Sequence, residues 1–305
     1  MSKIVFVTYA EHPAILPDDQ LAAEILRARG VTVESCVWNT PDVDWSQFDA
    51  VVVRSPWDYY KHPLEFGLWL DGLNVQQARV WNPTRLMLWN ANKTYLQDLQ
   101  NNGIAIVPTQ WVEQDTERTL AAMLEEQMFG APVAWYVIKP TISAGAYQTL
   151  RVRPQTLQAG STTEEAVFAE IVRHSQVMIQ PYMPEIAATG EYSFVFFHDS
   201  DQATLSHIIL KTPATGDFRS QEQFGSTLRA VKLDELSHTL LEQAHHVVDA
   251  AVSIVDTNWL YARVDGVVRD GQLLLMELEM IEPSLFLRFD ANAPQRFADA
   301  LLARL

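Results

Sequence analysis

The apolar residues in the first part of the chain fall in short runs, with one amphipathic segment between the first two. The runs Lys3 to Thr8, Val31 to Trp38 and Phe48 to Arg54 have the length of buried strands. Gln20 to Arg29 has the apolar spacing of a helix and is followed by Gly30, a common helix stop. Strands that alternate with a helix in this way predict a small open α/β sheet.

Polar and aromatic side chains follow two of these predicted strands. Tyr9 to His12 comes after the first strand, and Ser55 to Tyr59 comes after the third. Ligands of open α/β sheets bind beyond the carboxyl ends of the strands. We therefore expect these two segments to border a ligand site.

From residue 92 onwards the pattern predicts further strands and helices. Asn92 to Asn101 is a predicted helix, which Gly103 ends before a predicted strand from Ile104 to Trp111. This helix is expected to begin a second lobe. The later predictions are strands at Trp135 to Lys139, Thr149 to Val152, Val177 to Gln180, Tyr192 to His198 and Thr204 to Lys211, and helices at Glu164 to His174 and Leu233 to Val255.

The last pair of apolar runs predicts a β-hairpin. Tyr261 to Val268 and Leu273 to Met280 flank Arg269-Asp270-Gly271, and glycine in the third position suits a three-residue loop. In that register the two faces of the hairpin differ in polarity. One face carries the apolar residues Ala262, Val264, Val268, Leu274, Met276, Leu278 and Met280, and the other carries Arg263, Asp265, Glu277 and Glu279.

The charged face of the hairpin gathers three carboxylates beside one arginine. Carboxylates this close together repel one another unless a cation lies between them, and hard oxygen ligands select Mg²⁺ or Mn²⁺. One alternative is a solvated sheet face on which Arg263 offsets part of the charge. Another is a two-residue turn at Asp270-Gly271, which would scatter the charged groups to opposite faces. The hairpin is thus a candidate metal site, with these alternatives open.

The composition limits the partners that the protein can have. Its 305 residues are 48% hydrophobic, which is enough for more than one core. A net charge of -16 disfavours nucleic acid and anionic membranes, because both bind basic surfaces. The single cysteine, Cys36, excludes an internal disulfide and fits a reducing compartment. No apolar stretch has the features of a signal peptide or a membrane span, so we expect a cytoplasmic protein.

The sequence resembles the ATP-grasp superfamily over most of its length. Lys93 in NANKTYL and Lys139 in YVIKP match two lysines that contact the nucleotide phosphates in that family, although each lysine alone would also fit a solvated surface. Ser143-Ala144-Gly145-Ala146 is similar to the family's loop that closes over the outer phosphates. Gln180-Pro181-Tyr182-Met183 is similar to the linker that pairs with adenine, and Glu191 to the carboxylate that holds the ribose.

Two later segments extend this resemblance. The segment from Lys211 to Arg219 is similar to one whose cations bind the γ-phosphate and the acceptor carboxylate. In the hairpin, Arg263 matches the arginine of the transition state, while Asp265, Glu277 and Glu279 match the metal ligands. Most members have asparagine in place of Glu279. They also have a small-residue substrate loop where this chain continues with Ile281-Glu282-Pro283-Ser284.

A narrower resemblance is to the subgroup that contains the O-ureido-serine cyclo-ligase of cycloserine biosynthesis. It rests on the strings LPDD, VVVRSPWDY, GEYS and LMELEMIEPSLFL, and on the WN before Lys93. The resemblance implies the ATP-grasp fold, an α/β (α+β) arrangement. An N-terminal open-sheet lobe, residues 1–90, would precede two α+β lobes, 91–180 and 181–305, that clasp ATP.

The resemblance also implies a function, that of an ATP- and Mg²⁺-dependent ligase which joins a small carboxylate to an amine through an acyl phosphate. The residues expected to hold ATP are Lys93, Lys139, Ser143, Gly145, Gln180, Tyr182 and Glu191. Asp265, Glu277 and Glu279 would hold Mg²⁺ or Mn²⁺, and Arg263, Arg219 and Lys211 would balance the charge of the reaction. The acceptor would meet Arg54, Ser55, Trp57, Asp58, Glu282 and Ser284, although Trp57 fits a packed core aromatic equally well.

Several alternatives stay open on the sequence alone. The ligase could cyclise one molecule, or could condense two molecules as glutathione synthetase-like and peptide-forming enzymes do. A small-molecule kinase and a non-catalytic nucleotide-binding regulator belong to other classes, and the complete set of charged positions argues against the regulator. The expected partners are small molecules and, because dimers are common in the resembled family, a second copy of the chain.

Overall fold

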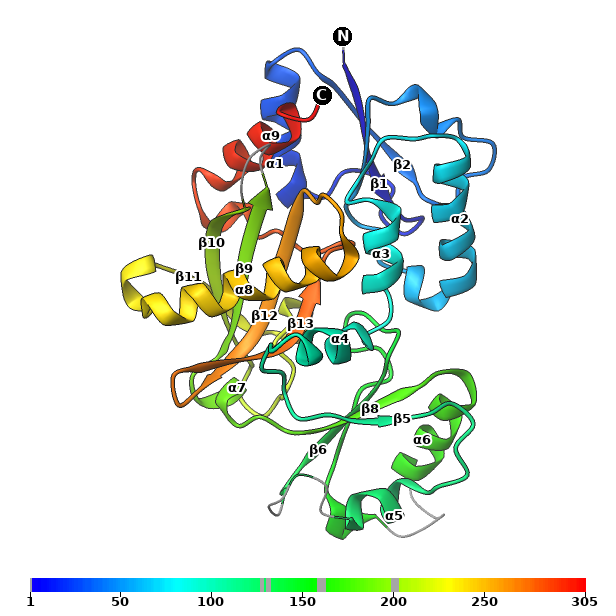
Figure 1. Ribbon diagram of the computed structural model, residues 1–305, viewed down its shortest axis with the longest axis vertical. Coiled ribbons are helices and arrows are strands. Elements are labelled where there is room, and N and C mark those ends of the chain that lie inside the picture. The colour runs from blue at the N-terminus through cyan, green and yellow to red at the C-terminus, as the bar shows by residue number, and fades with distance from the viewer. Residues whose placement is uncertain (1, 127–128, 130–132, 158–162, 199–202) are drawn as a thin grey trace.

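The computed structural model of this chain describes residues 2–126, 129, 133–157, 163–198 and 203–305. These residues form three sheets flanked by helices, in agreement with the predicted fold class. Along the long axis of the molecule the first sheet lies at one end, the third in the middle and the second at the other end (Figure 1). None of the described helices is long and apolar enough to cross a membrane.

The first sheet is parallel, with the order β2-β1-β3-β4. Its strands are β1 (Lys3–Thr8), β2 (Thr32–Val37), β3 (Ala50–Val53) and β4 (Val80–Trp81). Helix α1 (Pro17–Ala28) packs on one face together with the last helix, α9 (Ala293–Leu302), and α2 (Pro63–Val75) packs on the other (Figure 1). The expected open sheet is therefore present, and both ends of the chain pack in the same lobe.

The second sheet is antiparallel, with the order β5-β8-β6-β7. Its strands are β5 (Gln110–Val112), β6 (Tyr136–Pro140), β7 (Leu150–Val152) and β8 (Val177–Pro181). Helices α5 (Leu120–Glu125) and α6 (Thr163–His174) share one core with this sheet. Strand β6 carries Lys139 near its end, and β8 carries Gln180.

The third sheet is also antiparallel, with the order β11-β10-β9-β12-β13. Its strands are β9 (Glu191–His198), β10 (Ala203–Thr212), β11 (Thr227–Val231), β12 (Tyr261–Arg269) and β13 (Gln272–Glu279), and the short helix α7 (Glu185–Ala188) precedes β9. The long helix α8 (His238–Val255) packs on one face, and α3 (Thr84–Asn90) and α4 (Tyr95–Asn101) join the same core. The other face borders the candidate site.

Two local expectations near residue 100 are wrong. Helix α4 begins at Tyr95 rather than at Asn92, because the Asn92 side chain accepts a hydrogen bond from the backbone N–H of Thr94 (3.0 Å) in the turn before the helix. Ile104 to Trp111 is not one strand, since β5 starts only at Gln110. Ile104 instead packs in the core of the third sheet. The division of the chain at residues 90 and 180 stays a prediction.

Candidate active site

The hairpin of β12 and β13 turns differently from the sequence prediction. Arg269 pairs with Gln272, so the connection is a two-residue turn at Asp270-Gly271. Both turn residues have positive φ, 51° and 78°, as a type I′ turn requires. The predicted three-residue loop is therefore wrong.

A β-bulge between Asp265 and Gly266 nevertheless places the charged residues on one face. On the site side of the bulge, Asp265 lies opposite Glu277, and Arg263 lies opposite Glu279. Without the bulge, the two-residue turn would put the carboxylates of the two strands on opposite faces. Glycine is required at 266, because a Cβ there would lie 2.7 Å from the carbonyl oxygen of Leu274.

The bulge also shifts the alternation of β13 on the turn side, while the alternation of β12 continues unchanged. Ala262, Val264, Leu278 and Met280 lie in the large core with α8, as predicted, and Val268 packs against that core. Leu274 and Met276 lie instead in a small cluster with Val267, and Leu273 and Leu275 occupy the core. The predicted core positions of Leu274 and Met276 are wrong, because the bulge shifts the alternation by one residue.

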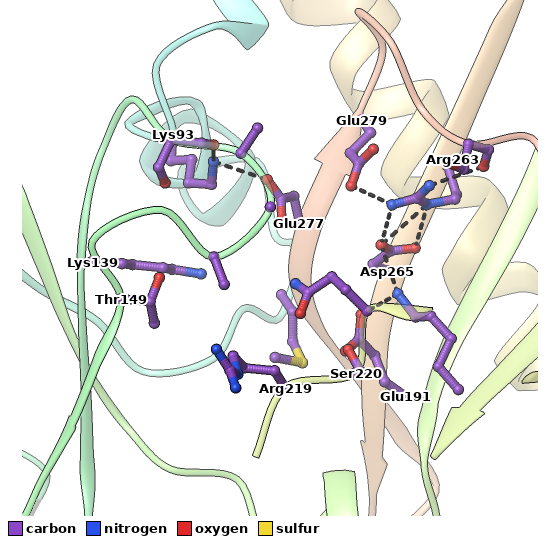
Figure 2. Close-up of a pocket in the computed structure, with 18 of the residues that line it drawn as sticks. Lys93, Lys139, Thr149, Glu191, Arg219, Ser220, Arg263, Asp265, Glu277 and Glu279 are labelled. Atoms are coloured by element: carbon purple, nitrogen blue, oxygen red, sulfur yellow. Dashed lines mark hydrogen bonds and ion pairs between the residues drawn. The ribbon is translucent and has the colours of Figure 1, made fainter. Parts of the chain in front are cut away.

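A cavity of about 630 Å³ lies beside the charged face of the hairpin. Figure 2 shows Lys93, Lys139 and Thr149 on one side of this cavity, facing Glu191, Asp265 and Glu279 on the other. The structure thus brings many of the predicted site residues to one place. Those that line the cavity are Trp57, Lys93, Lys139, Ser143, Gly145, Gln180, Tyr182, Glu191, Lys211, Arg219, Arg263, Asp265, Glu277, Glu279, Glu282 and Ser284.

The two predicted phosphate-binding lysines differ in their contacts. Lys93 is buried, donates to the backbone oxygen of Ser143 and forms an ion pair of 2.9 Å with Glu277. Lys139 has no ion-pair partner among the described residues, and its ammonium points toward the cavity (Figure 2). Burial lowers the pKa of Lys139, with Lys93 adding to this effect and Glu277 opposing it. Lys139 is the cation best placed to accept a new anion.

Asp265 is the most fully bonded carboxylate of the site. It accepts hydrogen bonds from Ser193 (2.6 Å), Lys211 (3.1 Å) and the Arg263 guanidinium (2.9 to 3.2 Å). Burial alone would raise its pKa, but Arg263 and Lys211 outweigh burial and lower the pKa to about 2. Asp265 is therefore ionised at neutral pH and holds both cations in place.

The two glutamates of β13 have different electrostatic surroundings. Burial would raise the pKa of Glu277, but Lys93 and Lys139 lower it below the ordinary value. Among the described residues Glu279 forms an ion pair with Arg263 alone, which Asp265 already shares, and burial raises the pKa of Glu279 to about 8. A further cation close to Glu279 would therefore stabilise the ionised form of the site.

Glu191 begins β9 and is held by two partners. Its Oε1 accepts from Lys211 (2.6 Å), and its Oε2 accepts from the hydroxyl of Ser220. Lys211 thus bridges Glu191 and Asp265, and these carboxylates raise its pKa against the opposing effect of burial. Both oxygens of Glu191 are already bonded in this structure, so binding of a ribose would have to share these contacts.

Arg219 is fixed at the mouth of the cavity by its own loop. Its guanidinium forms two hydrogen bonds with Asp217 (3.0 and 2.7 Å) and lies 3.6 Å from the ring centroid of Phe224. The same contacts with Arg219 lower the pKa of Asp217. The position is compatible with the predicted role toward an anion in the cavity.

The predicted phosphate loop crosses from the second sheet toward the first. The Ser143 hydroxyl donates to the Pro140 oxygen (3.1 Å), and Gly145 has a φ of 57°, which suits glycine. Tyr147 packs against Tyr60 at 5.0 Å between ring centroids. The loop therefore contacts the first lobe as well as its own.

The residues after β3 divide between the cavity and the core. Trp57 lines the cavity and donates from its ring nitrogen to the Glu282 oxygen (3.2 Å). Arg54 and Ser55 are buried and do not line it, while Asp58 accepts from the Trp38 ring nitrogen (2.8 Å) and lies outside the lining. Of the four candidates at this edge, only Trp57 is placed to touch a ligand.

Several residues that line or support the cavity were not singled out as site residues. Tyr9, Glu11, Tyr59, Tyr60 and Lys61 line it, and they lie in or next to the two segments expected to border a ligand. Their position after β1 and β3 was the available signal.

Other supporting residues act on the backbone or on the carboxylates. Ser193 faces Asp265 across the β9–β12 pair, and Asn90 holds β13 through the Leu278 oxygen and the Met280 N–H, both at 2.8 Å. Asn90 belongs to the WN string, but nothing local in the sequence indicates its partners, because they are almost two hundred positions away in the chain.

The carboxylates of the hairpin fit a divalent cation by their chemistry. Glu277 and Glu279 lie on the same face of β13, and Asp265 lies opposite Glu277, so all three offer hard oxygen donors to one region. Within the described part of the chain, no three His, Cys, Asp or Glu side chains already converge as a metal-binding group. The three carboxylates instead contact Lys93, Lys211 and Arg263.

Comparison with known proteins places this geometry in a family. The family described as the N-terminal domain of D-cycloserine synthetase DcsG matches residues 4–82. The cycloserine biosynthesis protein DcsG of Streptomyces lavendulae is 30% identical over 317 residues, which cover 100% of this chain and 99% of that protein. The crystal structure of D-cycloserine synthetase DcsG has a TM-score of 0.83 at 28% identity, covering 99% of each chain.

A more distant structure shows the same fold. The ATP-grasp ligase PsnB, solved with its minimal precursor, Mg and ADP, has a TM-score of 0.60 at 18% identity and covers 99% of this chain and 96% of its own. A ligase with this fold thus binds Mg and ADP. This chain belongs to the family of the cycloserine synthetase DcsG within the ATP-grasp ligases, and it is an ATP-dependent ligase that forms carbon–nitrogen bonds.

Proposed function

We propose that the cavity binds Mg-ATP and a small amino-acid-like substrate, and that the enzyme activates the substrate's carboxylate as an acyl phosphate. The observation that carries this proposal is the ammonium of Lys139, which forms no ion pair with any described residue and faces the carboxylates of the hairpin across the cavity (Figure 2). An acidic protein needs such a cation to hold a triphosphate. Lys93 and the loop at Ser143 and Gly145 would complete the phosphate site, with Gln180 and Tyr182 at adenine and Glu191 at the ribose.

The metal ligands in this proposal are Asp265, Glu277 and Glu279. Glu277 and Glu279 would exchange part of their contact with Lys93 and Arg263 for Mg²⁺ or Mn²⁺, and phosphate oxygens would fill further positions. When bound, the metal would neutralise the charge on the outer phosphates. The released cations Lys93 and Arg263 would then be available to the phosphate groups and to the acyl phosphate.

The chemistry follows from these positions without a covalent intermediate on the protein. A carboxylate oxygen of the substrate attacks the γ-phosphorus, and the bond from that phosphorus to the β-phosphate oxygen breaks to release ADP. An amine nitrogen then attacks the acyl carbon, phosphate leaves, and the nitrogen loses a proton. Arg263, Arg219 and Lys211 stabilise the charge at the acyl phosphate, and closure of the lobes excludes water.

The relative in cycloserine biosynthesis favours cyclisation of one molecule over condensation of two. In a cyclo-ligase the attacking nitrogen belongs to the same substrate, and O-ureido-serine is the first candidate. Trp57, Glu282 and Ser284 border the part of the cavity where that substrate would lie. Because the reaction consumes ATP, we place the enzyme in the cytoplasm, as a homodimer or a monomer.

The test is release of ADP and phosphate with Mg-ATP against O-ureido-serine, free amino acids and dipeptides. We expect release with one of these probes, and a loss of at least about 100-fold in Glu277→Gln, because that variant removes a metal ligand that also pairs with Lys93. A stable phosphorylated product would indicate a kinase instead. ATP binding without release for any probe would contradict the ligase assignment for these substrates.

A further inference from the structure

In and beside the hairpin, the described carboxylates that line the cavity form ion pairs with lysine or arginine, with one exception. Glu191, Asp265, Glu277 and Glu279 each contact a lysine or an arginine. Glu282 lines the same cavity, yet among the described residues no cation forms an ion pair with it. Burial accordingly raises the pKa of the Glu282 carboxyl to about 7, although Lys93 and Arg263 lie near enough to oppose this.

The backbone around Glu282 is held in place at every residue. The carbonyl oxygens of 281 to 285 each accept a hydrogen bond from a different side chain. In chain order the donors are Tyr261 Oη (2.9 Å), Trp57 Nε1 (3.2 Å), Arg54 Nη2 (2.7 Å), Arg263 Nη1 (2.9 Å) and His207 Nε2 (2.8 Å). His207 donates here because a carbonyl oxygen can only accept.

These donors come from the first lobe and from the third sheet. Arg54 is buried, with Asp19 at 3.2 Å and the Tyr261 ring 4.8 Å away, so its own position is fixed. A segment tied on both sides cannot shift to bring Glu282 toward a protein cation. The backbone that carries Glu282 is therefore fixed at the cavity wall, and its carboxylate has no cation partner in the described part of the chain, which is the arrangement expected for a residue that binds a cationic ligand group.

We propose that Glu282 binds the ammonium group of the substrate, so that the enzyme accepts amino acids whose α-amino group is free. This inference rests on the proposed ligase function. It agrees with a cyclo-ligase, because ring closure between the carboxylate and a side-chain nitrogen leaves the α-amino group unreacted. That group needs an anionic partner that is separate from the metal ligands, and Glu282 is a cavity-lining carboxylate beside the hairpin that forms no ion pair with the described residues.

Glu11 is the rival for this role. It lines the same cavity from the segment after β1. Its side chain is exposed, however, so water and salt weaken its attraction for an ammonium group. The Glu282 side chain is half-buried and projects from a backbone segment that the five hydrogen bonds fix, which favours Glu282 as the determinant of specificity.

The experiment compares matched ligands with and without the amino group. The first pair is O-ureido-serine and 3-(ureidooxy)propanoate, and the second is alanine and propanoate. Binding is measured by calorimetry in the presence of Mg²⁺ and a non-hydrolysable ATP analogue, for the wild type, Glu282→Gln and Glu11→Gln. Binding is used because it reports on recognition even where no probe is turned over, whereas failure of the ligase function would appear in ADP release alone.

For the wild type we expect the amino form of at least one pair to bind at least about 10-fold more tightly. In Glu282→Gln this preference should fall to about 2-fold or less, while affinity for the nucleotide analogue and its dependence on Mg²⁺ stay unchanged. Glu11→Gln should keep the preference. Equal binding of the two forms by the wild type, no binding of any amino form, loss of preference only in Glu11→Gln, or a change in Mg²⁺ dependence in Glu282→Gln would overturn the proposal.

Discussion

Arg54 serves the cavity without lining it. Its guanidinium pairs with buried Asp19, donates to the Pro283 oxygen and lies over the Tyr261 ring. The sequence indicated a ligand contact at this strand end, but the structure gives Arg54 a supporting position beneath the segment that carries Glu282. The difference arises because Pro283 and Tyr261 lie more than two hundred positions away in the chain, and no local pattern reveals that contact.

Removal of the Arg54 charge should destabilise the protein strongly. Arg54→Met leaves Asp19 buried without its cation, which costs about 3–5 kcal/mol for a buried pair. Urea unfolding would measure the change. The double variant Arg54→Met with Asp19→Asn should recover part of the loss, because no buried charge is left unpaired. A single variant within about 0.5 kcal/mol of the wild type would contradict a structural role for the pair.

Glu282 should also make the unfolding free energy of the protein depend on pH. Folding raises its pKa from 4.5 to about 7, so between these values the folded protein binds more protons than the unfolded chain. Stability due to this group is therefore full below about pH 4.5 and is lost as pH rises to about 7.

The amide of Glu282→Gln cannot titrate and removes this dependence. Relative to the wild type, the variant should gain on the order of 1–3 kcal/mol in unfolding free energy between pH 5 and pH 8. Unfolding in urea across this range would measure the gain. A constant difference between the two proteins would show that the pKa of Glu282 is not raised. The comparison cancels other titrating groups, such as His207, that both proteins share.

At the level of elements, the hairpin shows where the alternation of side chains along a strand predicts the correct face and where it does not. The pattern correctly placed Arg263, Asp265, Glu277 and Glu279 on one face, although the turn has two residues rather than three. The bulge at Gly266 compensates for the shorter turn and restores the alternation on the site side only. A glycine inside a predicted strand was the available signal for that bulge, and it explains why Leu274 and Met276 were misplaced.

Gly266→Ala should disturb the bulge and with it the site. The new Cβ would lie 2.7 Å from the Leu274 oxygen, so the backbone must move, at a cost of about 1–3 kcal/mol. Because that movement separates Asp265 from Glu277, ATP-dependent turnover should fall along with stability.

A matched control is Gly72→Ala in α2. Apart from its chain neighbours and the backbone of its own helix, no described atom lies within 4 Å of that added methyl group, and alanine favours a helix over glycine by about 0.5–1 kcal/mol. The control should therefore be as stable as the wild type or more stable, with unchanged turnover. Thermal unfolding and ADP release measure both variants. If the two behave alike, the close approach at Gly266 does not constrain the hairpin.

At the level of the whole molecule, the order of motifs along the chain predicted the fold, but it did not predict how the lobes pack together. Lys93, Lys139 and the hairpin carboxylates meet in one cavity, as the resemblance implies. The same reasoning did not show that α4 packs with the third sheet. Contacts between distant segments depend on side chains that face several neighbours at once, and a pattern within one segment carries no information about them.

The packing of α9 on α1 has a consequence for how the protein is made. Phe297 and Leu301 lie in one core with Phe6 and Leu26, so a helix synthesised long after the first sheet covers one face of that sheet. During translation that apolar face stays uncovered until residues 293–302 have left the ribosome. A nascent chain stalled before Ala293 would expose this face to chaperones and proteases, so the N-terminal lobe completes its fold only once α9 has been synthesised.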